Sequence, residues 1–332
     1  MLLQRLRKNP AILFGLFCLT ILLGWIVYMS WTNSWGLFRE NWFMTLVMVF
    51  GSLIAGASSE GGGAIAYPVM TLIFSIEPGV ARNFSFAIQS FGMSSAALWI
   101  FLSRIRIEKT YLLLAGTGGL VGIIAGSWLV APFVIPSYAK MMFVSFWLSF
   151  GIALWMVNFS KQRHNLDQLP ALTNFQKIEL ILVGVAGGIF SSVFGNGLDI
   201  CTFSYVVLKY GLSEKVATPT SVILMASNAV AGYAIQGIAF ENMQPEAVGY
   251  LLVCIPVVIF GAPLGAYTIN RFGRRSIASL LILIIIVQFI TALFVIQPDI
   301  NLSIFSAGIF LFGMIFFLYL TKIGKNSLKS SD

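Results

Sequence analysis

Residues 60–68 of this chain read EGGGAIAYP, a run of three glycines followed by a short apolar stretch that ends at residue 76. Glycine destabilises the interior of a helix, so three in succession predict a break between two helices. A second break, GNG at residues 195–197, precedes another short apolar stretch, residues 198–209. Neither short stretch has the roughly 20 residues that a helix needs to cross a bilayer. Two glycine-broken, short segments at matching places in two halves of a chain indicate the binding site of a transporter.

The two breaks also define a repeat. Placing Gly61 over Gly197 gives an offset of 197 − 61 = 136. The same offset, without a gap, matches four further pairs: Ser59 with Gly195, Tyr67 with Phe203, Ala81 with Ala217, and Ser85 with Ser221. Each half then consists of a glycine-broken hairpin and three helices.

The predicted helices follow from runs of apolar residues. They are residues 11–30, 42–58, 63–76, 82–102, 110–131, 139–158, 177–194, 198–209, 216–236, 246–269, 276–297 and 302–321. We expect five regions: an N-terminal extra helix and outer loop (1–41), a first repeat (42–158), a cytoplasmic linker (159–176), a second repeat (177–297), and a C-terminal helix with a basic cytoplasmic tail (298–332).

The composition is that of a membrane protein. Apolar residues make up 58% of the chain and charged residues only 10%, whereas a soluble domain of ordinary composition has about 25% charged residues. Period-two alternation is absent from the apolar runs, which argues against a β-barrel. No small-residue cleavage pattern follows the first apolar run, so we expect an uncleaved first helix. The fold class is therefore an all-α polytopic bundle in a bilayer.

The net charge of +8 lies in short basic clusters between the apolar runs. Clusters of this kind mark cytoplasmic loops, and they do not indicate nucleic-acid binding. Counting helices from these clusters places both termini in the cytoplasm. The membrane that the chain crosses is then the inner (plasma) membrane. The count gives eight full spans and two hairpins that enter from opposite sides, either fully or only part-way, so the two repeats have inverted topology.

The sequence offers no catalytic or metal-binding pattern. The one histidine, His164, lies in a polar loop, and the three cysteines lie in apolar runs without metal-ligand spacing. No phosphate-binding loop of the ATPase type is present. We therefore expect no enzymatic activity, no metal and no cofactor.

The quoted motifs resemble those of the TauE/SafE family of sulfite and organosulfonate exporters. That family has a glycine-rich motif followed by a proline in each half, then a helix start similar to Ala-x-x-Thr-Ser. Here the first motif is EGGGAIAYP, and the helix start in the second half is ATPTS at residues 217–221. The sequence departs from the pattern at Phe84, at Leu198-Asp199 and at Ser204. The resemblance covers about residues 42–297, and it implies export of sulfite, sulfoacetate or a related sulfonate.

A helix that begins at Gly63 or at Leu198 would point free N–H groups and the positive end of its dipole into the bundle, where an anion can bind. The alternative is that these small residues only allow close helix packing. Side chains near the two breaks and on the following helices complete the predicted substrate site. These candidates are Ser58, Ser59, Gly61, Gly62, Gly63, Arg82, Asn83, Ser85, Gln89, Ser192, Asn196, Gly197, Thr218, Thr220, Ser221 and Asn228, with Ser191 as a further hydroxyl.

Three charged residues lie close to the motifs. Arg82 could pair with a sulfonate in a forked geometry, or serve as an interfacial anchor or a partner for Glu77. Glu60 and Asp199 could couple transport to a proton or to Na⁺, because ionisable groups at membrane depth are costly and usually functional. Glu60 could instead cap a helix or lie in a wet vestibule.

These features predict a secondary transporter, an exporter of a small sulfur anion, that works by alternating access with its substrate between the two hairpin tips. The alternatives are an anion channel, a carrier for a small carboxylate or another inorganic anion, and a scaffold protein. The expected partners are the lipid bilayer and the small anion, with a proton or Na⁺ as coupling ion. The sequence gives no indication of an oligomeric state.

Overall fold

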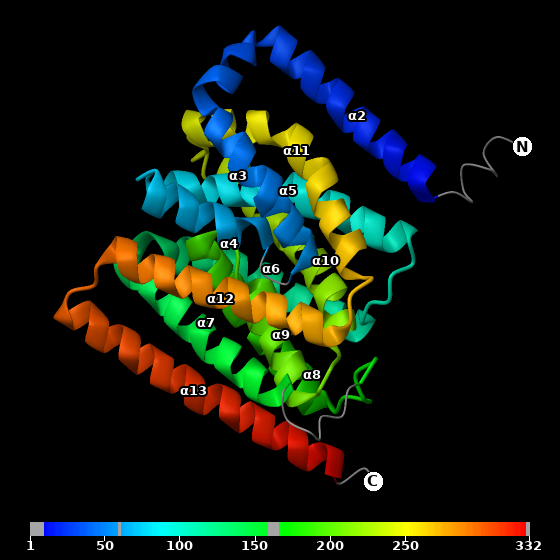
Figure 1. The fold of residues 1–332 in the computed structure, drawn as a ribbon, viewed down its shortest axis with the longest axis vertical. Helices are drawn as coiled ribbons and strands as arrows, with labels where there is room; N and C mark the ends of the chain where they lie inside the picture. The colour runs from blue at the N-terminus through cyan, green and yellow to red at the C-terminus, as the bar shows by residue number, and fades with distance from the viewer. Residues whose placement is uncertain (1–9, 59–60, 159–165, 330–332) are drawn as a thin grey trace, which may run out of the picture.

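A computed structural model describes residues 10–58, 61–158 and 166–329, and the regular elements of this part are helices joined by loops (Figure 1). The long helices are α2 (Pro10–Trp31), α3 (Leu37–Ala57), α5 (Pro78–Leu102), α6 (Lys109–Leu129), α7 (Pro136–Asn158), α8 (Asn174–Phe194), α10 (Glu214–Ala234), α11 (Pro245–Ile269), α12 (Arg274–Ile296) and α13 (Ile300–Lys329). The short ones are η1 (Ser34–Gly36), α4 (Gly61–Pro68), η2 (Val69–Ile73), η3 (Ala131–Phe133), α9 (Leu198–Lys209) and η4 (Ile235–Ala239). The described residues form no strand, which confirms the predicted all-α class.

Ten helices in the described residues are long and apolar enough to cross a membrane. The long arms α3 and α8 of the two hairpins are among them, where the sequence pattern predicts eight full spans and leaves open whether the hairpins span fully. Their partners α4 and α9 are too short. Each hairpin therefore combines one arm of spanning length with one short arm, because the glycine breaks fall at the end of a full-length helix.

Helix boundaries differ from the prediction where the backbone leaves regular α geometry. The predicted helix 63–76 is α4 followed by the π-helical turn η2, directly after Pro68. Proline has no N–H to donate, so it disturbs the hydrogen-bond ladder around it. The predicted helix 216–236 likewise continues into a π-helical turn, η4. The last helix, α13, extends to Lys329, beyond the predicted end at residue 321.

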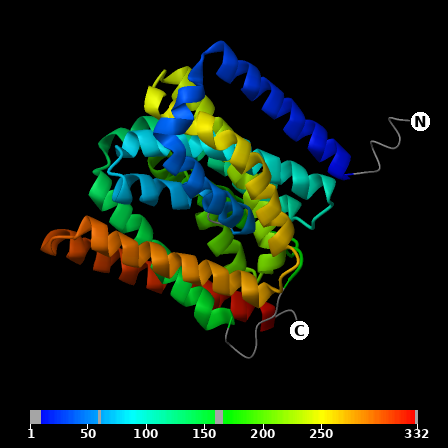
Figure 2. The same ribbon diagram turned by 45° about the horizontal axis from the view of Figure 1, so that its top comes forward.

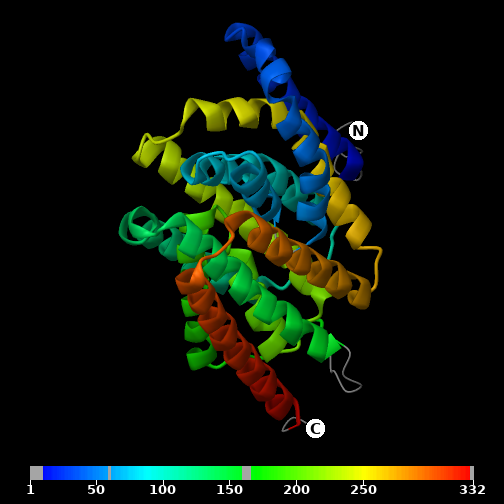
Figure 3. The same ribbon diagram turned by 60° about the vertical axis from the view of Figure 1, so that its left-hand side comes forward.

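The outer surface is apolar, as a bilayer requires. Large side chains such as Val27 on α2, Phe294 on α12 and Ile315 on α13 are exposed. In all three ribbon views α2 lies on one side of the bundle and α13 on the opposite side (Figures 2 and 3). Soluble monomers rarely expose an apolar surface of this extent.

Small residues bring helix backbones into direct contact at two interfaces. Where α6 packs along α8, a Cβ atom added to Gly122 would lie 2.1 Å from the carbonyl oxygen of Val185. Where α3 packs along α11, a Cβ on Gly56 would lie 1.8 Å from the carbonyl oxygen of Ala262. Within a bilayer, close backbone approach of this kind supplies the van der Waals contact that holds helices together.

The second hairpin lies deep in the bundle. Nearly every residue of α9 is buried. At its far end, Lys209 on α9 forms an ion pair with Glu179 on α8, with 2.5 Å between Nζ and Oε2. The Tyr205 hydroxyl bonds to both partners. The base of the hairpin is thereby fixed, and the tip at Gly195–Gly197 lies at the other end of α9.

Candidate transport site

The tip of the second hairpin depends on its two glycines. Gly195, which ends α8, has φ 81°, and Gly197, which precedes α9, has φ 149°. Residues with a Cβ rarely adopt such angles. Gly195 also has neighbours that leave no room, because an added Cβ would lie 2.6 Å from Cβ of Ser85 and 2.9 Å from the carbonyl oxygen of Arg82. The tip is therefore pressed against the start of α5.

The first N–H groups of α9 bond to side chains of the chain itself. The amide of Leu198 donates to Oγ of Ser191 at 2.9 Å, and the amide of Gly197 donates to Oδ1 of Asp199 at 3.1 Å. The position that the sequence predicts for a substrate anion thus has a carboxylate in it. Asp199 is 0% exposed, and its other oxygen, Oδ2, makes no hydrogen bond within the described part of the chain.

Gln89 on α5 lies between the tips of the two hairpins. Its Nε2 donates to the carbonyl oxygens of Gly195 and Ser85, each at 2.9 Å. A Cβ added to Gly61, at the start of α4, would lie 2.6 Å from Gln89 Oε1 and 2.3 Å from Sδ of Met225 on α10. Gly61 has φ 73°. Its lack of a side chain therefore lets the first tip approach the residue that holds the second tip.

Several predicted site residues lie close to these tips. Gly62 and Gly63 form the first turn of α4. Asn196 and Gly197 belong to the second tip, and Ser85 contacts it. Ser58 is buried at the end of α3. Ser59 and Glu60, from the first tip, lie outside the described residues.

Other predicted residues bond elsewhere. Asn83 donates to the carbonyl oxygen of Asn242 at 2.6 Å and to Gln244 Oε1 at 2.8 Å, so it connects α5 to the segment before α11. Thr220 accepts a bond from the amide of Glu108 at the start of α6. Ser192 faces Gly126 at the interface of α6 and α8.

Three further candidates on α10 are buried beside Thr220, namely Thr218, Ser221 and Asn228. Oγ1 of Thr218 and Oδ1 of Asn228 make no hydrogen bond among the residues with described positions. Buried polar atoms normally have partners, so both are available to a bound ion, substrate or water.

Arg82 lies in the first turns of α5, partly buried. Its Nε donates to Oδ1 of Asn83 at 3.3 Å, and it interacts electrostatically with Tyr67 and with Glu77. No ion pair of the described residues joins Arg82 to Glu77. The carbonyl oxygen of Arg82 lies against Gly195, which places the residue beside the second tip.

A cavity of about 410 Å³, counting the part open to solvent, adjoins the second tip. Its polar residues are Tyr67, Thr71, Lys140, Asn196 and Gln288, and the rest of its wall is apolar. It lies between the short arm of the first hairpin, α7, α12 and the second tip. The sequence motifs did not indicate Tyr67, Thr71, Lys140 or Gln288 as site residues. Lys140 could have been found, because it is a lysine within an apolar run and outside every basic cluster.

No group of three His, Cys, Asp or Glu side chains within residues 10–58, 61–158 and 166–329 could hold a metal ion.

Comparison with known proteins adds one match. The family model described as "Sulfite exporter TauE/SafE" matches residues 43–293, which is most of the chain and close to the range of the resemblance. No curated protein and no solved structure matches the chain. The proteins of this family are transporters, which agrees with the prediction that the chain is not an enzyme.

Proposed function

Since this chain belongs to the TauE/SafE family of sulfite exporters, we propose that it is a secondary carrier that binds a small sulfur anion, sulfite or an organosulfonate, where its two hairpin tips meet. That it is a multi-pass membrane transporter follows from the family and from the ten helices of spanning length. The specific anion, the alternating-access mechanism and the direction of export are the proposal.

One observation carries this proposal: a single side chain, Gln89, contacts both broken hairpins. Its amide bonds to Gly195, and its oxygen lies against Gly61. Irregular backbone is tolerated at membrane depth only where it is buried in protein or lines a cavity. Two such breaks at one point give a site that a movement of either hairpin can open, as alternating access requires.

An inverted repeat, with a first unit at 42–158 and a second at 177–297, is the arrangement that we propose for the two hairpins. The packing supports it. Gly56 on α3 meets Ala262 on α11, and Ser192 on α8 meets Gly126 on α6. These two contacts correspond to each other under the sequence offset, since 192 − 56 = 136 and 262 − 126 = 136. The first hairpin thus packs on the second unit as the second hairpin packs on the first.

Asp199 is the residue that we propose for ion coupling, together with Glu60. The Asp199 carboxylate stands at the start of α9, and it would repel an anion at the same place. A proton or a Na⁺ ion on the free Oδ2 would remove that repulsion, and Oδ2 lacks a hydrogen-bond partner in the described structure. Binding of the ion and binding of the anion would then favour each other, which is the thermodynamic basis of coupled transport.

The orientation in the membrane follows from the basic clusters. We propose that both termini are cytoplasmic in the inner (plasma) membrane and that the two hairpins enter from opposite faces. The substrate site near the two tips would then lie within the bilayer, reached from one face at a time.

Counterflow tests the proposal. Proteoliposomes that contain the purified protein would be preloaded with unlabelled sulfite, sulfoacetate, taurine, sulfate or acetate, and entry of labelled sulfoacetate would be followed. We expect stimulation by internal sulfoacetate and sulfite and none by acetate. Entry that is independent of the internal anion would instead establish a channel, and stimulation by acetate alone would establish a carboxylate carrier.

A further inference from the structure

Lys140 is a charged residue within a membrane-spanning helix, and it has no acidic partner among the described residues. It lies in the second turn of α7, and no ion pair of the described chain includes it. Its Nζ lies 6.0 Å from the centroid of the Tyr67 ring. A cation in an apolar span is costly unless an opposite charge or water compensates it. A cation–π contact at this distance compensates only a small part of that cost.

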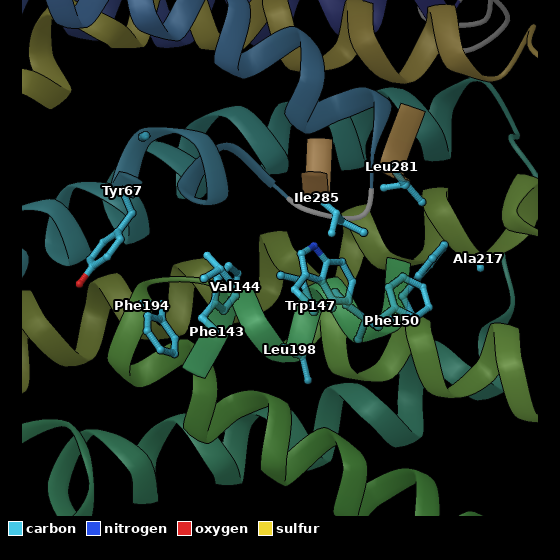
Figure 4. Packing of buried hydrophobic residues seen from close by; sticks show 14 of the residues in the cluster. Tyr67, Phe143, Val144, Trp147, Phe150, Phe194, Leu198, Ala217, Leu281 and Ile285 are labelled. Carbon is cyan, nitrogen blue, oxygen red and sulfur yellow. The ribbon is translucent and has the colours of Figure 1, made fainter. Parts of the chain in front are cut away.

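The space beside Lys140 is the cavity next to the second tip. Its walls include Tyr67 from the first hairpin, Phe143 and Val144 from α7, and Phe194 and Asn196 from the end of the second hairpin. Figure 4 shows Phe143, Val144 and Phe194 gathered together, with Tyr67 beside them (Figure 4). The ring of Phe194 packs 5.1 Å from that of Phe143 and 6.2 Å from that of Tyr67. Lys140 belongs to the lining of this cavity, and the surface that faces the cavity is apolar.

A second cation lies on the same side. Arg82 interacts electrostatically with Tyr67, so the tyrosine is influenced by a guanidinium as well as by the ammonium of Lys140. Among the described residues, the acidic residue that interacts with Arg82 is Glu77, which is exposed. The positive charge near Tyr67 therefore exceeds the negative charge among these residues.

We propose that this cavity is an anion site with Lys140 as its counter-charge, and that its apolar wall selects anions that carry a hydrocarbon part. An inorganic oxyanion would gain nothing from the apolar part of this wall, whereas burial of a hydrocarbon chain against it is favourable. The sulfonate group pairs with Lys140, and the carbon chain lies against Phe143, Val144 and Phe194. Asn196 belongs both to the wall of this cavity and to the tip of the second hairpin, so the inference rests on the proposed function.

The first test needs no variant. The full-length protein in lipid nanodiscs would be titrated by calorimetry with methanesulfonate, ethanesulfonate and propanesulfonate. Each buried methylene should tighten binding by up to about fourfold. A sulfonate affinity that stays constant or falls as the chain lengthens would refute the inference that the apolar wall binds the hydrocarbon part.

The second test concerns the charge. Lys140→Met keeps the length of the side chain and should weaken propanesulfonate binding at least about tenfold, while Lys140→Arg should stay within about threefold. Lys177→Met, at an exposed lysine of α8, is the matched control and should bind as the wild type does. Equal affinity of Lys140→Met and wild type would refute the role of Lys140. Val144→Thr, which adds a hydroxyl to the wall, should reduce the gain per methylene.

A bound anionic lipid would have the same charge as a sulfonate, and the composition of the nanodisc distinguishes the two ligands. Nanodiscs with and without phosphatidylglycerol should give the same sulfonate affinity, and a loss in the anionic membrane would show that a lipid is the occupant instead. Counterflow on the same proteins separates this site from the proposed carrier function. Sulfonate binding without counterflow would refute the carrier and keep this site, whereas counterflow unaffected by Lys140→Met would refute the site and keep the carrier.

Discussion

Replacing Gln89 by methionine would test how the hairpin tips are held. Methionine has a similar volume, so the change makes no large cavity, and it is the residue that the proposed repeat places at the equivalent position (225 − 89 = 136). The change removes the Nε2 donor at 2.9 Å from the carbonyl oxygen of Gly195. A buried polar group that loses its partner costs about 1–3 kcal/mol.

That free energy belongs to one arrangement of the tip, the one in which Gln89 holds Gly195. A loss of about 1–3 kcal/mol corresponds to a change of roughly 5- to 150-fold in an equilibrium between two arrangements. We therefore expect the counterflow rate of the Gln89→Met protein to fall at least about fivefold. Insertion and helix content should stay unchanged, because the main packing interfaces are elsewhere.

The matched control is Gln236→Met, the same change at another buried glutamine. The Oε1 of Gln236 makes no hydrogen bond in the described part of the molecule, so we expect counterflow close to that of the wild type. Rates of Gln89→Met within about twofold of the wild type, at equal amounts of inserted protein, would refute the inference that Gln89 holds the tips. An equal loss of counterflow rate in Gln89→Met and Gln236→Met would show that the effect is not specific to Gln89.

Three further changes test other parts of the molecule. Gly122→Leu should prevent stable folding, because even a Cβ would lie 2.1 Å from a backbone oxygen. The control Gly308→Leu, at a glycine with open space around it, should fold normally, and size-exclusion profiles that are alike for both variants would contradict the backbone contact. Asp199→Asn should abolish stimulation of uptake by an imposed ion gradient while exchange continues, and a gradient effect as large as in the wild type would exclude Asp199 as the coupling residue. Arg82→Ala should weaken binding of a sulfonate more than that of its neutral sulfonamide analogue, and equal losses would assign Arg82 a structural role.

The positions of the helices were predictable because the signals for them are local. Gly197 and the apolar run after it define α9, and the observed range, Leu198–Lys209, is the predicted one. The π-helical turns η2 and η4 were not predicted, since their backbone depends on how neighbouring helices pack around them. Whether the hairpins cross the bilayer fully was left open by the sequence, because a hairpin with one short arm resembles a segment that enters the membrane only part-way.

The site was predictable in part for the same reason. The glycine breaks, Gln89 and Asn196 were selected from sequence, and they lie together at the second tip. Asp199 was selected as well, but its bond to the amide of Gly197 was not foreseen. That bond depends on the turn geometry, which residue types alone do not fix.

Lys140 was not among the predicted site residues, although a lysine within an apolar run is a signal that the sequence contains. It is one lysine in an apolar run, and only the fold places it beside the second hairpin tip and the ring of Tyr67. Asn83 and Thr220 show the converse. Their sequence context was that of site residues, and the fold uses them to connect α5 and α10 to neighbouring segments.

The proposed site at the hairpin tips, which opens to one side at a time, can be tested at Asn196, which is 3% exposed. Asn196→Cys would be introduced into a protein whose three native cysteines, Cys18, Cys201 and Cys254, are replaced by alanine. A small membrane-impermeant thiol reagent would then be applied from either face of oriented vesicles, with and without sulfoacetate. We expect labelling from both faces and protection by sulfoacetate on each. Labelling from one face only, whether or not sulfoacetate is present, would contradict alternating access at the tips.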